Sequence, residues 1–213
     1  MECYCKSGMA LQSVTVILIS GMSGSGKSEL SAALRHRLAG ASILHLDGYY
    51  LPLTHLSWEE RARTNFDHPD SLDWPLMRAH LAELKAGRAI EVPVYNFAQH
   101  DREPYTHRLE PGQFVIAEGL LGLSDAALRE MADLMVFVDT PPEECLRRRV
   151  ARDVAERGRS AESVVEQWEK TVWPMAREFI LPSRRWAQLS VSGEQALEET
   201  SELVIRELEL AIS

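Results

Sequence analysis

The stretch that decides the fold is Gly21-Met22-Ser23-Gly24-Ser25-Gly26-Lys27-Ser28. It satisfies the pattern G-x-x-x-x-G-K-[ST], in which glycines let consecutive backbone N–H groups wrap a phosphate. In this pattern the lysine reaches the terminal phosphates of a nucleotide, and the final serine binds Mg²⁺. A dinucleotide fingerprint is excluded, because no third glycine follows at the required spacing. The predicted nucleotide contacts are Gly21, Ser23, Gly24, Ser25, Gly26, Lys27, Ser28 and Glu29.

The segments around this loop indicate one α/β domain. A buried strand is predicted at 14–20 and an amphipathic helix at 27–38, which places the loop between a strand and a helix as the motif requires. Further strands are expected at 42–46, 114–117, 134–138 and 189–191, and helices after residues 73, 141 and 196. A polar loop is expected after residue 47, through residues 65–69, and an arginine-rich loop is expected after the helix that follows residue 141. A hairpin is predicted at about 89–108, with its loop at 98–102. Alternating strands and helices imply a parallel sheet covered on both faces.

Composition narrows the class of protein. The chain has 213 residues, of which 45% are hydrophobic and 26% charged, as in ordinary globular domains. We expect a disordered tail at 1–12 and a single domain at 13–213. Residues 14–19 loosely mimic a signal peptide, but polar residues interrupt them and cleavage there would damage the phosphate loop. Because no stretch approaches the roughly 20 apolar residues of a membrane span, we expect no membrane partner.

Charge and cysteine content bear on the partner and on the compartment. The net charge is −9, which argues against nucleic acid as a partner. The three cysteines, Cys3, Cys5 and Cys145, form an odd set without framework spacing, which favours a reducing compartment and hence the cytoplasm. One segment reverses the overall charge: residues 147–159 hold six arginines. Arginine binds oxyanions with two parallel hydrogen bonds, so we interpret this run as phosphate-handling, the alternative being a solvated helix face.

Three acids end or follow apolar strands: Asp47, Glu118 and Asp139. In an open parallel sheet, ligands gather at the carboxyl ends of the strands, so all three are candidates for binding Mg²⁺ or for accepting a proton. Asp139 directly precedes Thr140-Pro141 and could instead cap the next helix. Spacing alone does not sort these roles.

Beyond the phosphate loop, several motifs resemble the uridine-cytidine kinases. In chain order they are Leu46-Asp47-Gly48-Tyr49-Tyr50, Asn65-Phe66-Asp67-His68-Pro69-Asp70, Pro93-Val94-Tyr95-Asn96-Phe97-Ala98-Gln99-His100-Asp101-Arg102, Ala117-Glu118-Gly119 and the arginine-rich run 148–159. The match extends from about residue 14 to 191. It implies a P-loop kinase fold with a five-stranded parallel sheet flanked by helices, a β-hairpin over the acceptor site and a mobile arginine-rich lid at about 152–162.

The resemblance also implies an activity, the transfer of the ATP γ-phosphoryl group to the 5′-hydroxyl of uridine or cytidine in pyrimidine salvage. In that family Asp47 matches the general base and lies beside Mg²⁺, with Glu118 assisting and Ser28 completing the metal site. Lys27, Arg152 and Arg157 match cations that stabilise the transferring phosphate. GTP as an alternative donor and a homo-oligomer, often a tetramer, are further expectations from the family.

The implied substrate contacts are Asp67, Tyr95, His100, Arg149, Arg159 and Gln167. Asp67 matches an acid that grips the ribose hydroxyls, with Arg149 and Gln167 as its counterparts. Tyr95 and His100 match residues that read the pyrimidine edge. The rings of Phe66 and Phe97 either stack on a base or fill the core.

The sequence departs from the family pattern at Gly48, Tyr49, Leu51, Asn96 and Gln188, which leaves the shape of the acceptor pocket open. Two alternatives follow. The first is a related kinase with another hydroxyl acceptor, like phosphoribulokinase or pantothenate kinase; a sugar phosphate would need its own anion site outside the lid. The second is a nucleotide switch without an acceptor. A guanine switch carries an Asn-Lys-x-Asp motif, which this sequence lacks.

Overall fold

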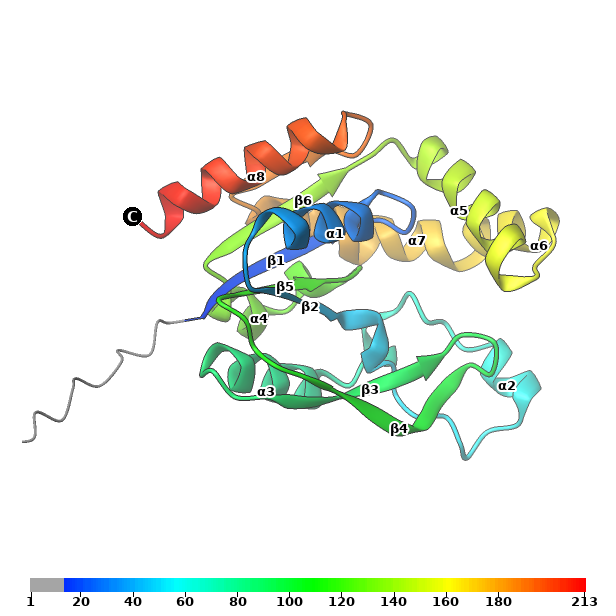
Figure 1. The fold of residues 1–213 in the computed structure, drawn as a ribbon. Coiled ribbons are helices and arrows are strands. Elements are labelled where there is room, and N and C mark those ends of the chain that lie inside the picture. Colours follow the sequence, from blue (N-terminus) through cyan, green and yellow to red (C-terminus); the bar gives the residue numbers. More distant parts are fainter. Residues whose placement is uncertain (1–13) are drawn as a thin grey trace, which may run out of the picture.

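The computed structural model describes residues 14–213, so the tail predicted at 1–12, with Cys3 and Cys5, lies outside the described residues. Five parallel strands form one sheet in the order β2-β5-β1-β6-β7 (Figure 1). Their bounds are β1 Thr15–Gly21, β2 Ala41–His45, β5 Phe114–Glu118, β6 Leu134–Asp139 and β7 Leu189–Ser192. Because all pairings are parallel, the carboxyl ends of the strands meet at one edge of the sheet.

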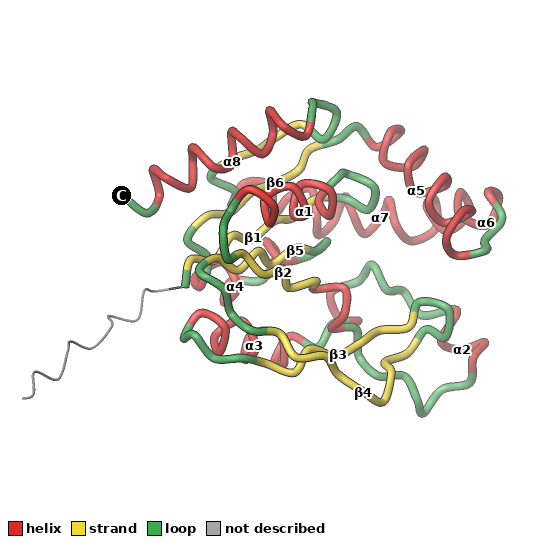
Figure 2. The backbone as a smooth tube through the Cα atoms, viewed as in Figure 1, coloured by secondary structure: helices red, strands yellow, loops and turns green. Residues whose placement is uncertain are grey.

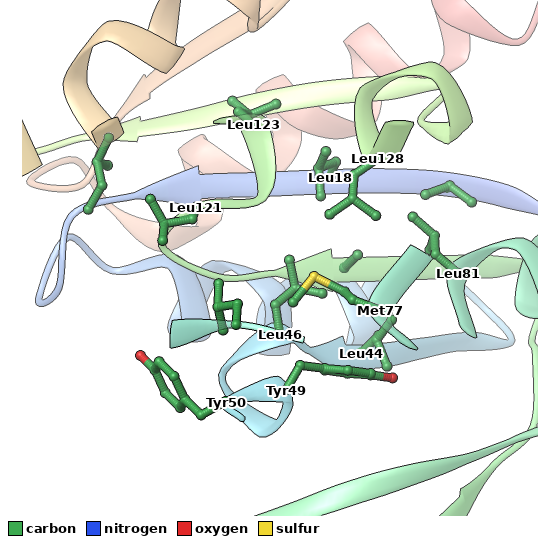
Figure 3. Packing of buried hydrophobic residues seen from close by; sticks show 14 of the residues in the cluster. Leu18, Leu44, Leu46, Tyr49, Tyr50, Met77, Leu81, Leu121, Leu123 and Leu128 are labelled. Carbon is green, nitrogen blue, oxygen red and sulfur yellow. The ribbon is translucent and has the colours of Figure 1, made fainter. Parts of the chain in front are cut away.

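The central strand β1 is apolar on both sides, as a doubly covered sheet requires. Ile17 and Ile19 belong to a cluster with α1 (Lys27–Arg37) and α8 (Leu197–Ala211). Val16 and Leu18 belong to a second cluster with α3 (Trp74–Lys85) and α4 (Ala126–Met131). Figure 3 shows Leu18 among Met77, Leu81 and Leu128 of that second cluster. One helical layer therefore covers each face, and the strand ends stay free to carry a site.

The hairpin consists of β3 (Ile90–Asn96) and β4 (Asp101–Leu109) (Figure 2). The loop was predicted at 98–102, and its C-terminal boundary is wrong. Strand β4 already begins at Asp101, which pairs with Asn96 of β3. Asp101 is anchored by the backbone N–H of Leu53 at 2.8 Å and by Arg61 at 2.8 Å. Arg102 in turn donates to the carbonyl oxygen of Tyr50 at 2.6 Å, so tertiary contacts extend the strand.

The arginine-rich run is helical, which corrects the expectation of a loop after a short helix. Helix α5 extends from Pro142 to Arg157 and ends at Gly158, whose φ of 64° stops it. A short turn leads into α6 (Ala161–Gln167), capped by Ser160. In Figure 1, α5 and α6 lie on the same side of the molecule as the hairpin tip and α2 (Trp58–Ala62), beyond the strand ends.

The remaining elements are short. Helix α2, which replaces part of a predicted loop, begins with a capping box between Ser57 and Glu60. After α6 the helical path continues irregularly around α7 (Trp173–Met175), since Pro174 removes a backbone donor and the turns on both sides widen. These π turns are Trp168–Val172 and Ala176–Ile180, and the 3-10 turns are Leu46–Tyr49, Pro69–Ser71, Gly122–Ser124 and Leu181–Trp186. Within residues 14–213, no helix has the length and apolarity to cross a membrane.

Candidate active site

A cavity of about 1490 Å³ opens at the carboxyl edge of the sheet, between the phosphate loop, the hairpin and α5. This volume exceeds the roughly 300–1,000 Å³ of a typical single-ligand pocket. The sequence-predicted site residues on its wall are Ser23, Gly24, Gly26, Lys27, Ser28, Glu29, Asp47, Asp67, Tyr95, His100, Glu118, Arg149, Arg152, Arg157, Arg159 and Gln167. Residues from distant parts of the chain therefore meet around one space.

Gly21 and Ser25 are the two predicted contacts that do not line this cavity. Gly21 ends β1 so close to β6 that a Cβ atom there would lie 2.5 Å from the carbonyl oxygen of Val138. The Ser25 side chain is buried, and its backbone carbonyl accepts a hydrogen bond from Thr140 at 2.8 Å. Both residues fix the path of the loop.

The loop also needs glycine where it touches other elements. At Gly24, with φ of +83°, a Cβ atom would lie 2.4 Å from the carbonyl oxygen of Cys145 in α5. At Gly193, after β7, a Cβ atom would lie 2.1 Å from the carbonyl oxygen of Ser25. The second contact was not predicted, because nothing near Gly193 in the sequence marks it as a neighbour of the loop. The loop is thus held in shape by backbone contacts from two sides.

The phosphate end of the cavity carries one buried lysine beside two acids. The Lys27 ammonium group donates to the carbonyl oxygen of Met22 at 2.9 Å within the loop. Asp47 lies in the 3-10 turn directly after β2, and Glu118 is the last residue of β5, the neighbouring strand. Ser28 Oγ lies 3.4 Å from Glu118 Oε1. The adjacent strand ends thus bring Asp47, Glu118 and Ser28 to the mouth of the loop.

Electrostatics separate these two acids. Burial, and next the negative charge of Glu118, raise the pKa of Asp47 above its ordinary value. Burial would also raise the pKa of Glu118, but the hydrogen bond from His45 Nδ1 at 2.6 Å and the charge of Lys27 lower it. Glu118 therefore ionises first, and Asp47 holds its proton more tightly.

The third candidate acid, Asp139, is excluded from this group by its position. Its carboxylate forms an ion pair with Arg184 at 2.5 Å and lines a separate cavity of about 560 Å³. Pro141, and not Asp139, precedes the first residue of α5, so the capping alternative is not realised either. The oxygen set of Ser28, Asp47 and Glu118 has the hard-ligand chemistry that Mg²⁺ prefers, and two neighbouring carboxylates are suited to a cation between them. These residues therefore fit the ion that the resemblance implies.

The hairpin end of the cavity is aromatic. The His100 ring stacks on Phe66, with centroids 5.5 Å apart and planes 13° apart, and Tyr95 packs against Tyr50 and Phe97. His100 occupies a left-handed conformation with φ of 50°, which the tight turn of the hairpin imposes. Phe66 packs against the core and also lines the cavity, whereas Phe97 is 41% exposed and does not fill the core.

One buried acid faces this aromatic group. Asp67 is 4% exposed, and burial raises the pKa of its carboxyl, while the charge of Arg149 opposes that shift. Arg149 itself donates to Ser23 Oγ at 2.9 Å and to Gln167 Oε1 at 3.0 Å. Gln167 also accepts from Arg159 at 2.5 Å. A hydrogen-bonded chain thus joins the phosphate loop to the end of α6 and to the turn that follows α5.

Asp153 is the residue that the sequence analysis missed. It is completely buried and lies within ion-pair distance of four guanidinium groups, at 2.8 to 3.8 Å. These groups belong to Arg149, Arg152, Arg157 and Arg159. In the sequence Asp153 is one of two acids in a basic run. Helix α5 brings three arginines to it, and the following turn adds Arg159.

The departures from the family pattern have local explanations. The Asn96 side chain accepts from the backbone N–H groups of Ala98 and Gln99 and so holds the hairpin turn. The hydroxyl group of Tyr49 bonds to His80 Nδ1 at 2.8 Å inside the core, and Gln188 accepts from the N–H of Met135. Leu51 is exposed. None of these side chains lines the cavity.

Comparison with known proteins agrees with this geometry. A model of the Phosphoribulokinase / Uridine kinase family matches residues 16–196. A uridine kinase of Histophilus somni (strain 2336) is 43% identical over 189 residues, which cover 86% of this chain and 89% of the relative. A uridine kinase of Salmonella paratyphi B (strain ATCC BAA-1250 / SPB7) is 46% identical over 182 residues, covering 83% and 85%.

Two solved structures share the fold at low sequence identity. Phosphoribulokinase from Rhodobacter spheroides has a TM-score of 0.65 at 15% identity, covering 85% of this chain and 70% of that one. A D-glycerate 3-kinase from Cryptococcus neoformans has a TM-score of 0.61 at 15% identity, covering 90% of each chain. The strand order, the phosphate loop and this likeness define a P-loop kinase. Within that class, the family match and the curated relatives give the narrower result: the chain belongs to the phosphoribulokinase / uridine kinase family. The resemblance inferred from the motifs is thereby confirmed.

Proposed function

We propose that this chain transfers the γ-phosphoryl group of ATP to the 5′-hydroxyl of uridine or cytidine. Relatives named uridine kinase that are 43% and 46% identical over most of both chains support this acceptor. The observation that carries the proposal is one continuous cavity, walled at one end by Lys27 of the phosphate loop and at the other by Asp67, Tyr95 and His100. Such a cavity suits a nucleotide donor and a nucleoside acceptor bound together.

The chemistry assigned to the phosphate end follows from its charges. Asp47 accepts the proton of the 5′-hydroxyl, the oxygen forms a bond to the γ-phosphorus, and the bond to the ADP oxygen breaks. Lys27, Arg152 and Arg157 stabilise the charge on the equatorial oxygens of the transferring group. Mg²⁺, held by Ser28, Asp47 and Glu118, supplies charge neutralisation on the phosphates when bound.

The acceptor end is proposed to read the nucleoside. The Asp67 carboxylate accepts hydrogen bonds from the ribose hydroxyls, with Arg149, Gln167 and Arg159 around it. His100 and Tyr95 contact the pyrimidine edge. The His100–Phe66 stack fixes the imidazole plane, which limits the bases that fit beside it.

A sugar phosphate is a poorer acceptor for this cavity. Lys27 and the arginines of its described wall belong to the phosphate loop, to α5 and to the turn that follows α5. On the hairpin side, Arg61 is paired with Asp101, and Arg102 is bound to Asp73 and two backbone carbonyls. A phosphate on the acceptor would have to compete with these contacts.

One assay separates the candidates. ATP and Mg²⁺ are offered with uridine, cytidine, ribulose 5-phosphate or pantothenate, and ADP release is followed. We expect turnover with the two pyrimidine nucleosides and only background release with the other compounds. Turnover with ribulose 5-phosphate or pantothenate alone would identify a different acceptor, and ADP release at one rate with or without any acceptor would identify a switch.

Three further properties are part of the proposal: the alternative donor, the oligomeric state and the location in the cell. GTP as an alternative donor is tested by replacing ATP in the uridine assay. A homo-oligomer is tested by light scattering of the purified chain. A cytoplasmic location follows from the cysteine content and is tested by fractionating cells that carry the protein.

A further inference from the structure

Arg157 and Phe97 connect two elements that face each other across the cavity. Arg157 is the last residue of α5, and Phe97 lies in the hairpin turn just after β3. The guanidinium carbon of Arg157 lies 4.6 Å from the centroid of the Phe97 ring. Both side chains line the cavity. The contact is therefore a cation–π interaction between the lid and the hairpin.

Arg157 has a second, weaker contact on its own helix. Its NH1 atom lies 3.5 Å from Asp153 Oδ1. Among the four arginine contacts to Asp153, this distance is the second longest. A guanidinium group uses its edge for a carboxylate and its face for an aromatic ring, so the two contacts are compatible. Together they fix both the position and the plane of the group.

The chain beyond Arg157 adds little support. Gly158 follows at once in a left-handed conformation, and a Cβ atom built there would meet nothing within 4 Å. An arginine at the end of a helix has several rotatable bonds, so one ion pair at 3.5 Å leaves its guanidinium group free to swing. The Phe97 ring restricts that swing from the opposite wall.

We propose that Phe97 is a positioning residue that acts through Arg157, holding its guanidinium group over the site of phosphoryl transfer. This inference depends on the role given to Arg157 in the proposed function. It explains why a large aromatic ring that is 41% exposed stands in the hairpin turn. It also means that the position of the Arg157 guanidinium group depends on the hairpin, which encloses the acceptor.

A double-mutant cycle tests this inference with uridine and ATP. Phe97→Leu should lower kcat by about 3- to 20-fold, the value of one partly desolvated cation–π contact, with little change in KM for either substrate. Phe97→Trp, which keeps an aromatic face, should retain most of the activity. In an Arg157→Ala background, Phe97→Leu should cost no further kcat. Tyr105→Leu, at a 59% exposed ring on the same hairpin and away from the cavity wall, is the control and should leave kcat unchanged.

Three outcomes would overturn the inference, and thermal melting of each variant checks that it is folded. An equal loss in both backgrounds means that Phe97 acts independently of Arg157. A rise in KM for uridine at constant kcat means that Phe97 contacts the base alone. If Arg157→Ala itself leaves kcat unchanged, the role of Arg157 in the proposed function fails as well, so the two failures are distinguishable.

Discussion

Asp47 and Glu118 are two neighbouring acids with opposite pKa shifts, and this difference supports the roles proposed for them. Glu118 is held ionised by His45 and Lys27, which suits a permanent ligand of a cation. Asp47 has a raised pKa, which brings it closer to the range in which a base can both accept and return a proton. The opposite shifts therefore support the proposal that Asp47, although it lies beside the cation, also serves as the base.

Replacing Asp47 tests this assignment. In Asp47→Asn, ATP binding should survive, while kcat should fall by about 10²-fold or more because the proton acceptor is gone. Calorimetric titration with ATP and steady-state rates with uridine measure the two effects. Glu130→Gln, at an exposed acid on α4 that does not line the cavity, is a charge control and should leave kcat close to that of the wild type. An unaltered turnover in Asp47→Asn would remove Asp47 as the base.

His100 gives a prediction on pH. Burial, and next the charge of Arg159, lower the pKa of His100 below its ordinary value of 6.5. The folded protein thus favours the neutral ring, and the associated stability is present above 6.5 and is lost as the pH falls through the folded-state pKa. We expect KM for uridine to rise over the same acidic range, since protonation adds charge beside Arg159. KM for ATP should change less.

The comparison variant is His100→Asn, whose side chain does not titrate. Its KM for uridine should be raised at neutral pH and should no longer depend on pH in the acidic range. If wild type and variant show the same pH dependence, another group is responsible.

At the residue scale, the motifs predicted many of the residues that line the cavity, but not the buried residues that hold those residues in place. Asp67, Tyr95 and His100 occur in strings specific enough to name them, and all three line the cavity, although their functions remain predictions. Gly193 could not be found in this way, because its contact with Ser25 joins segments distant in sequence. Asp153 was missed for another reason: its partners lie within six residues of it, but their spacing was not weighed. The four-residue spacing of Arg149 and Arg157 from Asp153 is the local signal that could have revealed it.

At the scale of the element, α5 shows why the arginine run had to be helical. Arg149, Asp153 and Arg157 are spaced four residues apart and so lie on one face of the helix. A loop would lose this alignment, and four guanidinium groups would repel one another without a common carboxylate. The sequence analysis expected a loop because it weighed charge and not the spacing of Asp153.

Replacing Asp153 should therefore affect both stability and rate. In Asp153→Asn the four arginines lose their shared charge, and breaking such a buried pair costs about 3–5 kcal/mol. Differential scanning calorimetry should record a Tm lower by roughly 6–20 °C for a domain of this size. The value of kcat should fall as well, because Arg152 and Arg157 lose their anchor.

The control for this variant is Glu166→Gln on α6. It removes an exposed ion pair between Glu166 and Lys170. Exposed pairs of this kind contribute about 0–1 kcal/mol, so its Tm should stay close to that of the wild type. A Tm for Asp153→Asn equal to that of the control would contradict the role of Asp153.

The hairpin shows the same limit of sequence reasoning. Its existence was predicted correctly, whereas the start of β4 was not, because the bonds of Asp101 to Leu53 and of Arg102 to Tyr50 join segments far apart in the chain. The two-residue periodicity of a strand does not indicate such long-range hydrogen bonds. Boundaries set by tertiary contacts therefore escaped prediction, while elements set by local pattern did not.

At the scale of the whole molecule, the fold and family were predicted because the deciding signals are contiguous. The phosphate loop lies between β1 and α1, and the alternation of strands and helices fixed the class of sheet. In the proposed function one cavity serves both substrates, and this arrangement has a kinetic consequence. Donor and acceptor should bind together before any product leaves.

Initial-rate kinetics check this consequence. Double-reciprocal plots against ATP at several uridine concentrations should intersect, and exchange of labelled ADP into ATP should require the nucleoside product. Parallel lines, together with exchange in the absence of that product, would indicate a phosphorylated enzyme and contradict a shared cavity.

On the hairpin side, Arg61 and Arg102 are each paired with an acid, and this bears on how many phosphoryl groups the acceptor receives. A nucleoside monophosphate could react again only if its phosphate took the place of the hydroxyl beside Asp47. That shift would push the base deeper, against the His100–Phe66 stack. There Arg61 and Arg102 are already bound to Asp101, Asp73 and backbone carbonyls and offer no compensation. Under the proposed function, we therefore expect one ATP to be consumed per nucleoside, with no diphosphate formed.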